Sequence, residues 1–164
     1  MADELPDEFI EKVRTAVKRV GPDKFLLGEV WEDATTKFGF DKRRTYLLGK
    51  GLDSVMNYPF KNAVLGFVCG RDAGQTMTDI LSICEHYPAP ALDTTLNFLS
   101  THDTERALTV IADEPANGRG REWQSGRCVT GEAYEEGMLR LRMAYAIIYT
   151  LPGVPCLYYG DEIG

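Results

Sequence analysis

The sequence predicts an α/β fold in which helices cover a parallel β-sheet. Apolar segments of strand length alternate with segments of helical periodicity, a pattern typical of parallel strands joined by helical crossovers. The first strand candidate, residues 24–31, is almost continuously apolar, as a strand buried on both faces requires. About four of them fit in the 164 residues, whereas a complete eight-stranded β/α (TIM) barrel needs about 250 residues. We therefore expect half of such a barrel.

The first part of the chain is expected to hold one helix and two strands. Residues 7–20 carry apolar side chains at helical spacing, with Pro6 near the start and Gly21 just after the end. The apolar run 24–31 is the first strand candidate. A polar loop with several glycines follows, and residues 52–58 form the second strand candidate, which ends in Asn-Tyr-Pro.

The remaining elements continue the alternation of helix and strand. In chain order we expect a helix at 74–86, a strand at 95–100, a short helix at 105–112, an exposed polar segment at 118–131, a long and mostly buried helix at 133–150, and a strand at 154–159. Because strands and helices alternate in this way, the strands should run parallel to one another.

Composition excludes several classes of function. The net charge of −7 disfavours nucleic acids and anionic membranes as partners, since both are polyanions. The acidic start of the chain does not resemble a signal peptide, and the cysteines lack a C-x-x-C pair, so a reducing compartment and a cytoplasmic location are favoured. The two histidines lack metal-ligand spacing, so we expect no metal site and no cofactor in this chain.

Ionisable side chains follow two of the strand candidates, where parallel α/β folds place their functional residues. Glu29 lies close to the aromatic Trp31, and a carboxylic acid beside an apolar ring can keep its proton for glycoside cleavage. Asp103 supplies a negative charge for an oxocarbenium-like centre, and His102 supplies hydrogen bonds to sugar hydroxyls. The alternatives are that Glu29 is a solvated residue, that Trp31 is packing, and that Asp103 or Thr104 caps the next helix.

Three segments together resemble one family. Residues 28–31, Gly-Glu-Val-Trp, resemble the fifth-strand motif of the α-amylase superfamily, whose members hydrolyse α-glucans. Residues 98–106 are similar to its seventh-strand motif with the diagnostic His-Asp pair, and residues 152–164 resemble its eighth-strand segment. The resemblance spans essentially the whole chain and is closest to the neopullulanase, cyclomaltodextrinase and maltogenic-amylase branch.

The resemblance implies a role for each matching residue. Glu29 corresponds to the general acid/base and Asp103 to the aspartate that stabilises the transition state. Trp31 would stack on the sugar at the leaving-group side, where the Asp3 and Glu4 positions also line the subsite. The residues expected to bind substrate are His102, Trp31, Glu4, Asp3 and Arg106.

The chain departs from the family pattern at the nucleophile. A retaining glycosidase needs a second carboxylate about 5–5.5 Å from the acid, and the family carries it in a fourth-strand motif Arg-Leu-Asp-Val. Residues 1–4 match only the tail of that motif. We therefore expect residues 1–164 to be a fragment with strands five to eight, inactive alone, and any calcium site to belong to the missing half.

The expected partner of the parent enzyme is an α-glucan oligosaccharide. A half-barrel leaves the strands near residues 25–29 and 156–160 as unpaired edges, so we also expect a homodimer that closes a barrel. The alternative function is that of a non-catalytic sugar-binding or structural relative of the same superfamily.

Overall fold

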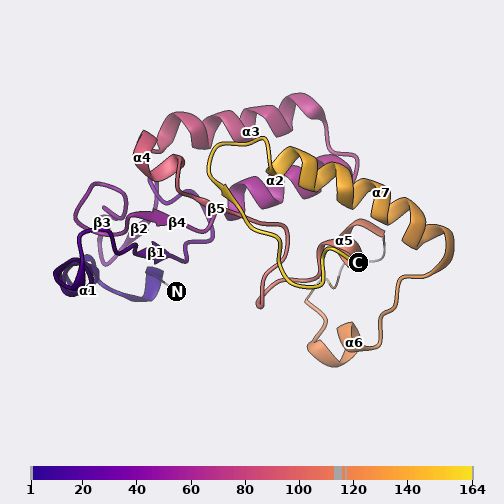
Figure 1. Cartoon of the computed structure of the whole chain (residues 1–164), viewed down its shortest axis with the longest axis horizontal. Helices are drawn as coiled ribbons and strands as arrows, with labels where there is room; N and C mark the ends of the chain where they lie inside the picture. The colour runs from indigo at the N-terminus through magenta and orange to yellow at the C-terminus, as the bar shows by residue number, and fades with distance from the viewer. Residues whose placement is uncertain (1, 113–115, 117, 164) are drawn as a thin grey trace.

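The computed structural model describes residues 2–112, 116 and 118–163 (Figure 1). It confirms the prediction of an α/β fold with parallel strands. Four short strands correspond to the four strand candidates: β1 (Leu27–Gly28), β4 (Ser54–Val55), β5 (Leu96–Asn97) and β6 (Val154–Pro155). Each pairs over fewer residues than expected, because a continuous apolar run reports burial and not the length of the hydrogen-bonded ladder.

The order of these strands in space follows their order in the chain. Leu27 is the register partner of Ser54, an isolated parallel bridge joins Met56 to Leu96, and Leu96 pairs in turn with Val154. Every one of these pairings is parallel. Sequential parallel neighbours are the arrangement that successive β/α units produce.

Buried amide side chains connect three of the strands. Asn57, directly after β4, donates from Nδ2 to Asn97 Oδ1 of β5 at 3.1 Å, and Asn97 Nδ2 donates to the carbonyl oxygen of Pro152, which lies just before β6, at 2.7 Å. Both asparagines are fully buried. Because each buried amide finds partners on a neighbouring segment, the network satisfies groups that would otherwise be costly to bury.

The predicted helices are present with small shifts of their ends. They are α1 (Asp7–Val20), α3 (Ala73–His86), α5 (Ala107–Ala112) and α7 (Gly131–Ile148). The expectation that the last helix is mostly buried is wrong: only Gly137, Leu141, Ala144 and Ile148 of α7 are buried, so the helix covers the core with one face.

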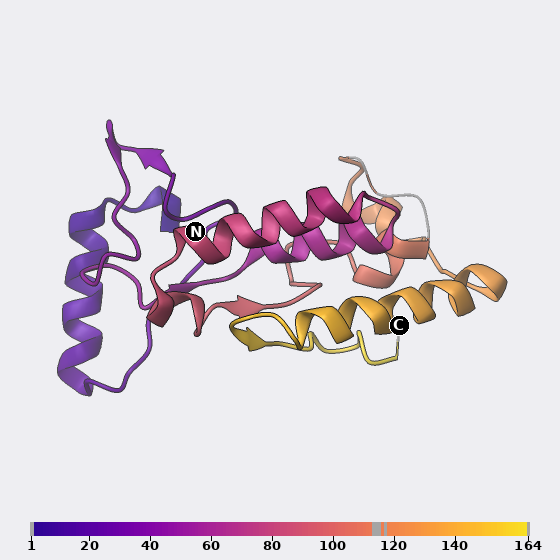
Figure 2. The ribbon, with the colours of Figure 1, turned by 90° about the horizontal axis from the view of Figure 1, so that it is seen from above.

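The largest error of the sequence interpretation concerns α2 (Tyr58–Val68), which was not expected. The helix begins where the second strand candidate ends, because the Asn57 side chain accepts a hydrogen bond from the Phe60 amide at 3.1 Å and Pro59 lies in the first turn. Phe60 and Val64 are fully buried. A helix buried on most of its surface lacks the polar face that periodicity detects. Figure 2 shows α2 lying alongside α3, and both α3 and α7 contact it.

Four shorter elements were also unexpected: a 3-10 turn (Ala2–Glu4), α4 (Ala89–Leu92), α6 (Arg121–Ser125) and an antiparallel hairpin of β2 (Phe38–Gly39) and β3 (Lys42–Arg43). The hairpin lies in the loop that follows the candidate acid. None of the helices in the described part of the chain is long and apolar enough to cross a membrane.

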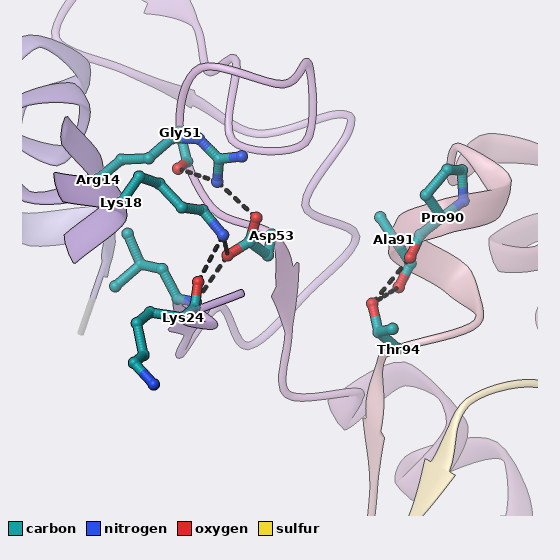
Figure 3. Close-up of polar contacts among 9 residues, drawn as sticks. Arg14, Lys18, Lys24, Gly51, Asp53, Pro90, Ala91 and Thr94 are labelled. Atoms are coloured by element: carbon teal, nitrogen blue, oxygen red, sulfur yellow. Dashed lines mark hydrogen bonds and ion pairs between the residues drawn. The ribbon is translucent and has the colours of Figure 1, made fainter. Parts of the chain in front are cut away.

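One carboxylate attaches α1 to the sheet (Figure 3). Asp53, just before β4, accepts hydrogen bonds from Arg14 at 2.7 Å, from Lys18 at 2.9 Å and from the Leu26 amide at 2.7 Å. Burial opposes its ionisation, but the bonds from Lys18, Leu26 and Arg14 outweigh burial and lower the pKa of Asp53. The carboxylate therefore stays charged and joins the helix to the edge of β1.

Candidate active site

Glu29 extends directly from the carboxyl end of β1. A Cβ atom at the preceding Gly28 would lie 2.1 Å from Leu52 Cδ1, so only glycine lets the strand approach this close. The Glu29 carbonyl accepts a hydrogen bond from the Ala2 amide at 3.0 Å, and its Oε1 accepts one from the Tyr58 hydroxyl at 3.2 Å. The close packing at Gly28 and the bond from Ala2 thus fix the backbone at the predicted acid, and the bond from Tyr58 orients its carboxylate.

Tyr58 contacts two of the predicted site residues, Glu29 and Trp31, and the sequence interpretation did not include it. Its ring stacks on Trp31 with centroids 4.3 Å apart and an interplanar angle of 16°, and meets Phe98 edge-on at 4.9 Å. The residue is only 1% exposed. Its place at the end of the second strand candidate was the available signal, because strand ends carry functional residues in parallel α/β folds.

The hydroxyl of Tyr58 donates to one of the two predicted catalytic carboxylates, Glu29. Burial raises the pKa of Tyr58 to about 12, and the negative charges of Glu29 and Asp103 act in the same direction, against an opposing hydrogen bond with Thr101. The phenol therefore remains a proton donor at neutral pH.

The His-Asp pair follows β5 on a tight turn. His102 Nε2 lies 3.1 Å from Asp103 Oδ2, and the two side chains are 68% and 43% exposed. The turn is held because the Thr101 amide donates to Thr104 Oγ1 at 2.9 Å. Both side chains are therefore presented to solvent on a fixed backbone, where a ligand can reach them.

The proposal that Asp103 or Thr104 caps the following helix finds no support among the described contacts. The amide of Ala107, the first residue of α5, donates instead to Ser100 Oγ at 2.9 Å. The Thr104 hydroxyl oxygen accepts a hydrogen bond from the Thr101 amide. Capping by Ser100 leaves the Asp103 carboxylate available for another role.

A cavity of about 390 Å³ opens beside this pair, and its lining includes Trp31, His102 and Asp103. Its volume falls within the usual range of about 300–1,000 Å³ for small-molecule sites. Lys61 also lines it, and burial lowers the pKa of that lysine while the charge of Glu105 opposes the shift. Trp31 Nε1 is buried and has no hydrogen-bond partner among the described residues, so an unused donor lies at this site.

The predicted leaving-group residues differ in how they are held. Asp3 accepts a hydrogen bond from the Tyr46 hydroxyl at 2.7 Å and lies 3.1 Å from Lys37 Nζ. Burial, and then the hydrogen bond to Asp3, raise the pKa of Tyr46. Glu4 is exposed, and its carboxylate makes no hydrogen bond or ion pair with the described part of the chain. Asp3 is thus fixed by its neighbours, whereas Glu4 faces solvent.

Arg106 contacts the segment after β6. Its guanidinium lies 5.0 Å and 4.7 Å from the ring centres of Tyr158 and Tyr159, and donates to the Tyr159 carbonyl and, at 3.4 Å, to Asp161 Oδ1. Asp161 also accepts a hydrogen bond from the Tyr145 hydroxyl at 2.5 Å. The contacts of Arg106 are to protein groups, and they join the loops that follow β5 and β6.

No group of three or more histidine, cysteine, aspartate or glutamate side chains within the described ranges is arranged to hold a metal ion. The site described above is therefore built from carboxylates, a phenol, an indole and an imidazole. Such groups can transfer protons, stabilise positive charge and bind a polyhydroxylated ligand.

Parallel β/α units with carboxylates at the ends of their strands are typical of β/α-barrel enzymes. The comparison with known families gives the same class. Residues 4–164 match the α-amylase family (Alpha amylase, catalytic domain). The chain therefore belongs to the α-amylase catalytic-domain family, which confirms the resemblance found in its motifs.

Individual members of the family are similar to this chain over its whole length. The chain is 33% identical over 180 residues to amylopullulanase of Thermoanaerobacter thermohydrosulfuricus, covering 100% of this chain and 11% of the relative. It is 30% identical over 166 residues to cyclomaltodextrinase of Geobacillus thermopakistaniensis, covering 100% of this chain and 23% of the relative. Neopullulanase 2 and maltogenic α-amylase are further relatives, as the motifs predict.

A solved structure has a similar arrangement of helices and strands. The cyclic alpha-maltosyl-(1→6)-maltose hydrolase from Arthrobacter globiformis, in complex with maltose, superposes with a TM-score of 0.72 at 29% identity, covering 98% of this chain and 30% of that one. The chain thus spans less than a quarter of the two curated relatives described above and under a third of the solved structure.

Proposed function

We propose that this chain provides strands five to eight of the barrel of a retaining α-glucan hydrolase, with Glu29 as the general acid/base and Asp103 as the stabilising carboxylate. The observation that carries the proposal is the Tyr58 side chain, whose hydroxyl donates to Glu29 at 3.2 Å and whose ring stacks on Trp31. Trp31 lines the cavity together with His102 and Asp103, whereas Glu29 is reached through Tyr58.

Each side chain then has a definite task. Glu29 protonates the oxygen of the glycosidic bond as it breaks and later accepts a proton from the attacking water. Tyr58 donates to Glu29 Oε1 and so orients the carboxyl group. Asp103 stabilises the oxocarbenium-like transition state, and the exposed His102 donates to sugar hydroxyls. Trp31 stacks on the sugar that leaves.

The substrate class follows from the relatives. Those compared here are named for cyclomaltodextrin, pullulan and maltosyl-maltose, and we propose an α-glucan of this type: a maltodextrin, a cyclodextrin, pullulan or starch. No segment of the 164 residues matches the nucleophile motif. We therefore propose that the nucleophile comes from another part of the protein and that this chain alone does not hydrolyse glucans.

The test uses leaving groups of different basicity in the full-length protein. A fluoride needs no protonation to depart, whereas a sugar alcohol does. Glu29→Gln should therefore cleave α-maltosyl fluoride with a modest loss of kcat and maltotriose with a loss of several orders of magnitude. Asp103→Asn should lose activity on both substrates to a similar extent. A Glu29→Gln protein that cleaved maltotriose at the wild-type rate would refute the assignment and favour a non-catalytic relative.

A further inference from the structure

The β2–β3 hairpin has no part in the site described so far, yet it displays two aromatic rings to solvent. Phe38 is 76% exposed and Phe40 is 52% exposed. Two neighbouring phenyl rings on a protruding hairpin forgo the stabilisation that burial would give them. A ligand that covers the rings would recover that stabilisation.

The turn of the hairpin is strained to hold one of these rings. Phe40 has φ 54° and Asp41 has φ 59°, and they are the only residues other than glycine with positive φ in the described part of the chain. Two-residue turns with this backbone favour Asn-Gly or Asp-Gly, because side chains rarely adopt left-handed φ. Strained positions cluster at binding and catalytic sites, and this one carries an aromatic ring that is 52% exposed.

The base of the hairpin is firmly anchored to the start of the chain. Arg44 directly follows β3, its side chain is 1% exposed, and its Nε lies 2.8 Å from Asp7 Oδ1. It also donates to the carbonyl oxygens of Asp3 and Leu5. The same guanidinium lies 5.2 Å from the centre of the Phe40 ring. The ring is therefore held in place by a buried ion pair.

Lys37, directly before β2, links the hairpin to the candidate site. Its Nζ lies 3.1 Å from Asp3 Oδ2 and 2.5 Å from Glu32 Oε2, and Glu32 is the residue after Trp31. Asp3 and Trp31 are the residues assigned above to the leaving-group side of the glucan. The hairpin thus begins where the assigned substrate contacts end.

The charges around the hairpin favour an uncharged ligand. Three of the four cations next to the rings face a carboxylate: Lys37 pairs with Asp3, Arg44 with Asp7, and Lys42 with Glu8 at 2.6 Å. The fourth, Arg43, is the register partner of Phe38 and donates to the Thr35 carbonyl oxygen at 2.7 Å. An anionic ligand would have to displace these partners. A glucose unit is neutral and presents an apolar face of C–H groups that an aromatic ring can cover.

We propose that the β2–β3 hairpin is an outer subsite for α-glucan chains, in which Phe38 and Phe40 stack on glucose units beyond Trp31. The inference rests on the proposed function and extends it from the point of cleavage to the length of the substrate. Short substrates end before the hairpin, whereas long ones reach it.

Chain-length dependence in the full-length protein tests the inference. For Phe38→Ala and Phe40→Gly we expect kcat/KM on maltohexaose to fall about three- to tenfold, the range that an aromatic contact supports, while kcat/KM on maltotriose stays within about twofold. Phe40→Gly should at the same time raise Tm, because glycine relieves the strained turn. The matched control is Tyr149→Ala: Tyr149 is 56% exposed and lies between α7 and β6, before the strand and so at the opposite end of it from the site loops, and neither substrate should be affected.

Each other outcome overturns a distinct claim. If the wild type cleaves both substrates and the hairpin variants change neither rate, or change both equally, the subsite is wrong while the proposed function stands. If the hairpin variants instead convert a dimer to a monomer without altering glucan kinetics, the rings form a protein interface and the subsite is also wrong. If the wild type cleaves no α-glucan, both proposals fail.

Discussion

Replacing Asp53 tests how α1 is held against the sheet. Its carboxylate is 15% exposed and accepts hydrogen bonds from Arg14, Lys18 and the Leu26 amide (Figure 3). Asp53→Asn keeps the shape of the side chain, removes the negative charge and turns an amide N–H₂ towards donors. The perturbation is therefore confined to charge and hydrogen bonding.

The structure sets the size of the effect. A hydrogen bond to a charged group contributes about 1.5–3 kcal/mol. The sum of three such bonds overestimates the loss of stability in the Asp53→Asn variant. Arg14 and Lys18 are 21% and 27% exposed, so both cations regain water when Asp53 is replaced. We expect the free energy of unfolding to fall by about 2 kcal/mol at pH 7.

The dependence on pH follows from the lowered pKa of Asp53. A carboxyl group whose pKa is lower in the folded state stabilises the fold above its unfolded pKa, here near the ordinary value of 3.8, and this stabilisation is lost as the pH falls through the folded pKa. Urea unfolding of wild type and Asp53→Asn, followed by circular dichroism, should show the full difference at pH 7 and a shrinking one below that value.

The control and the refuting result are clear. Asp93→Asn changes an exposed aspartate and should alter stability by less than about 0.5 kcal/mol. If Asp53→Asn behaved like Asp93→Asn at pH 7, or if its effect were as large at pH 2.5 as at pH 7, the ion pairs would not be what holds α1.

Two further predictions concern the site and the assembly. Tyr58→Phe keeps the ring against Trp31 but removes the hydroxyl on Glu29, so kcat in the full-length protein should fall about tenfold with little change in KM; Tyr58→Ala should raise KM as well, and equal kinetics for both variants would exclude the orienting role. We also propose that the 164-residue chain dimerises through the free edges of β1 and β6, where the barrel-facing candidates Phe25 and Leu157 are 51% and 43% exposed. Sedimentation at micromolar concentrations should show a dimer that dissociates on dilution, and a monomer at all concentrations would refute this.

The sequence predicted the helices that have one polar face, and it singled out candidate site residues at strand ends, whose roles stay predictions. The helices α1 and α3 were predicted because their apolar residues recur at helical spacing, and Glu29 and Asp103 because each follows an apolar run. The helix α2 was missed because Val64 and its neighbours are buried on most sides.

Contacts between distant residues explain the rest of what was missed. Tyr58 acquires its role only through Glu29, 29 residues away in the chain. The β2–β3 turn was missed because Phe40 and Asp41 lack the glycine or asparagine that announces a left-handed turn. The strand-end position of Tyr58 could be read from the sequence, but its contact with Glu29 could not, and no turn residue in the local sequence indicated the left-handed backbone.

The buried amide network through Asn57 and Asn97 has a consequence for assembly. A shift of one residue between neighbouring strands turns every side chain to the opposite face, and it would separate Asn57 from Asn97 and Asn97 from the Pro152 carbonyl. Misaligned strands would thus bury amides without partners, a penalty that apolar residues, which tolerate sliding, do not impose. The network therefore favours the correct strand register over misaligned ones. If a barrel is completed from two separate halves, Asn57 and Asn97 set the register of the strands in this half.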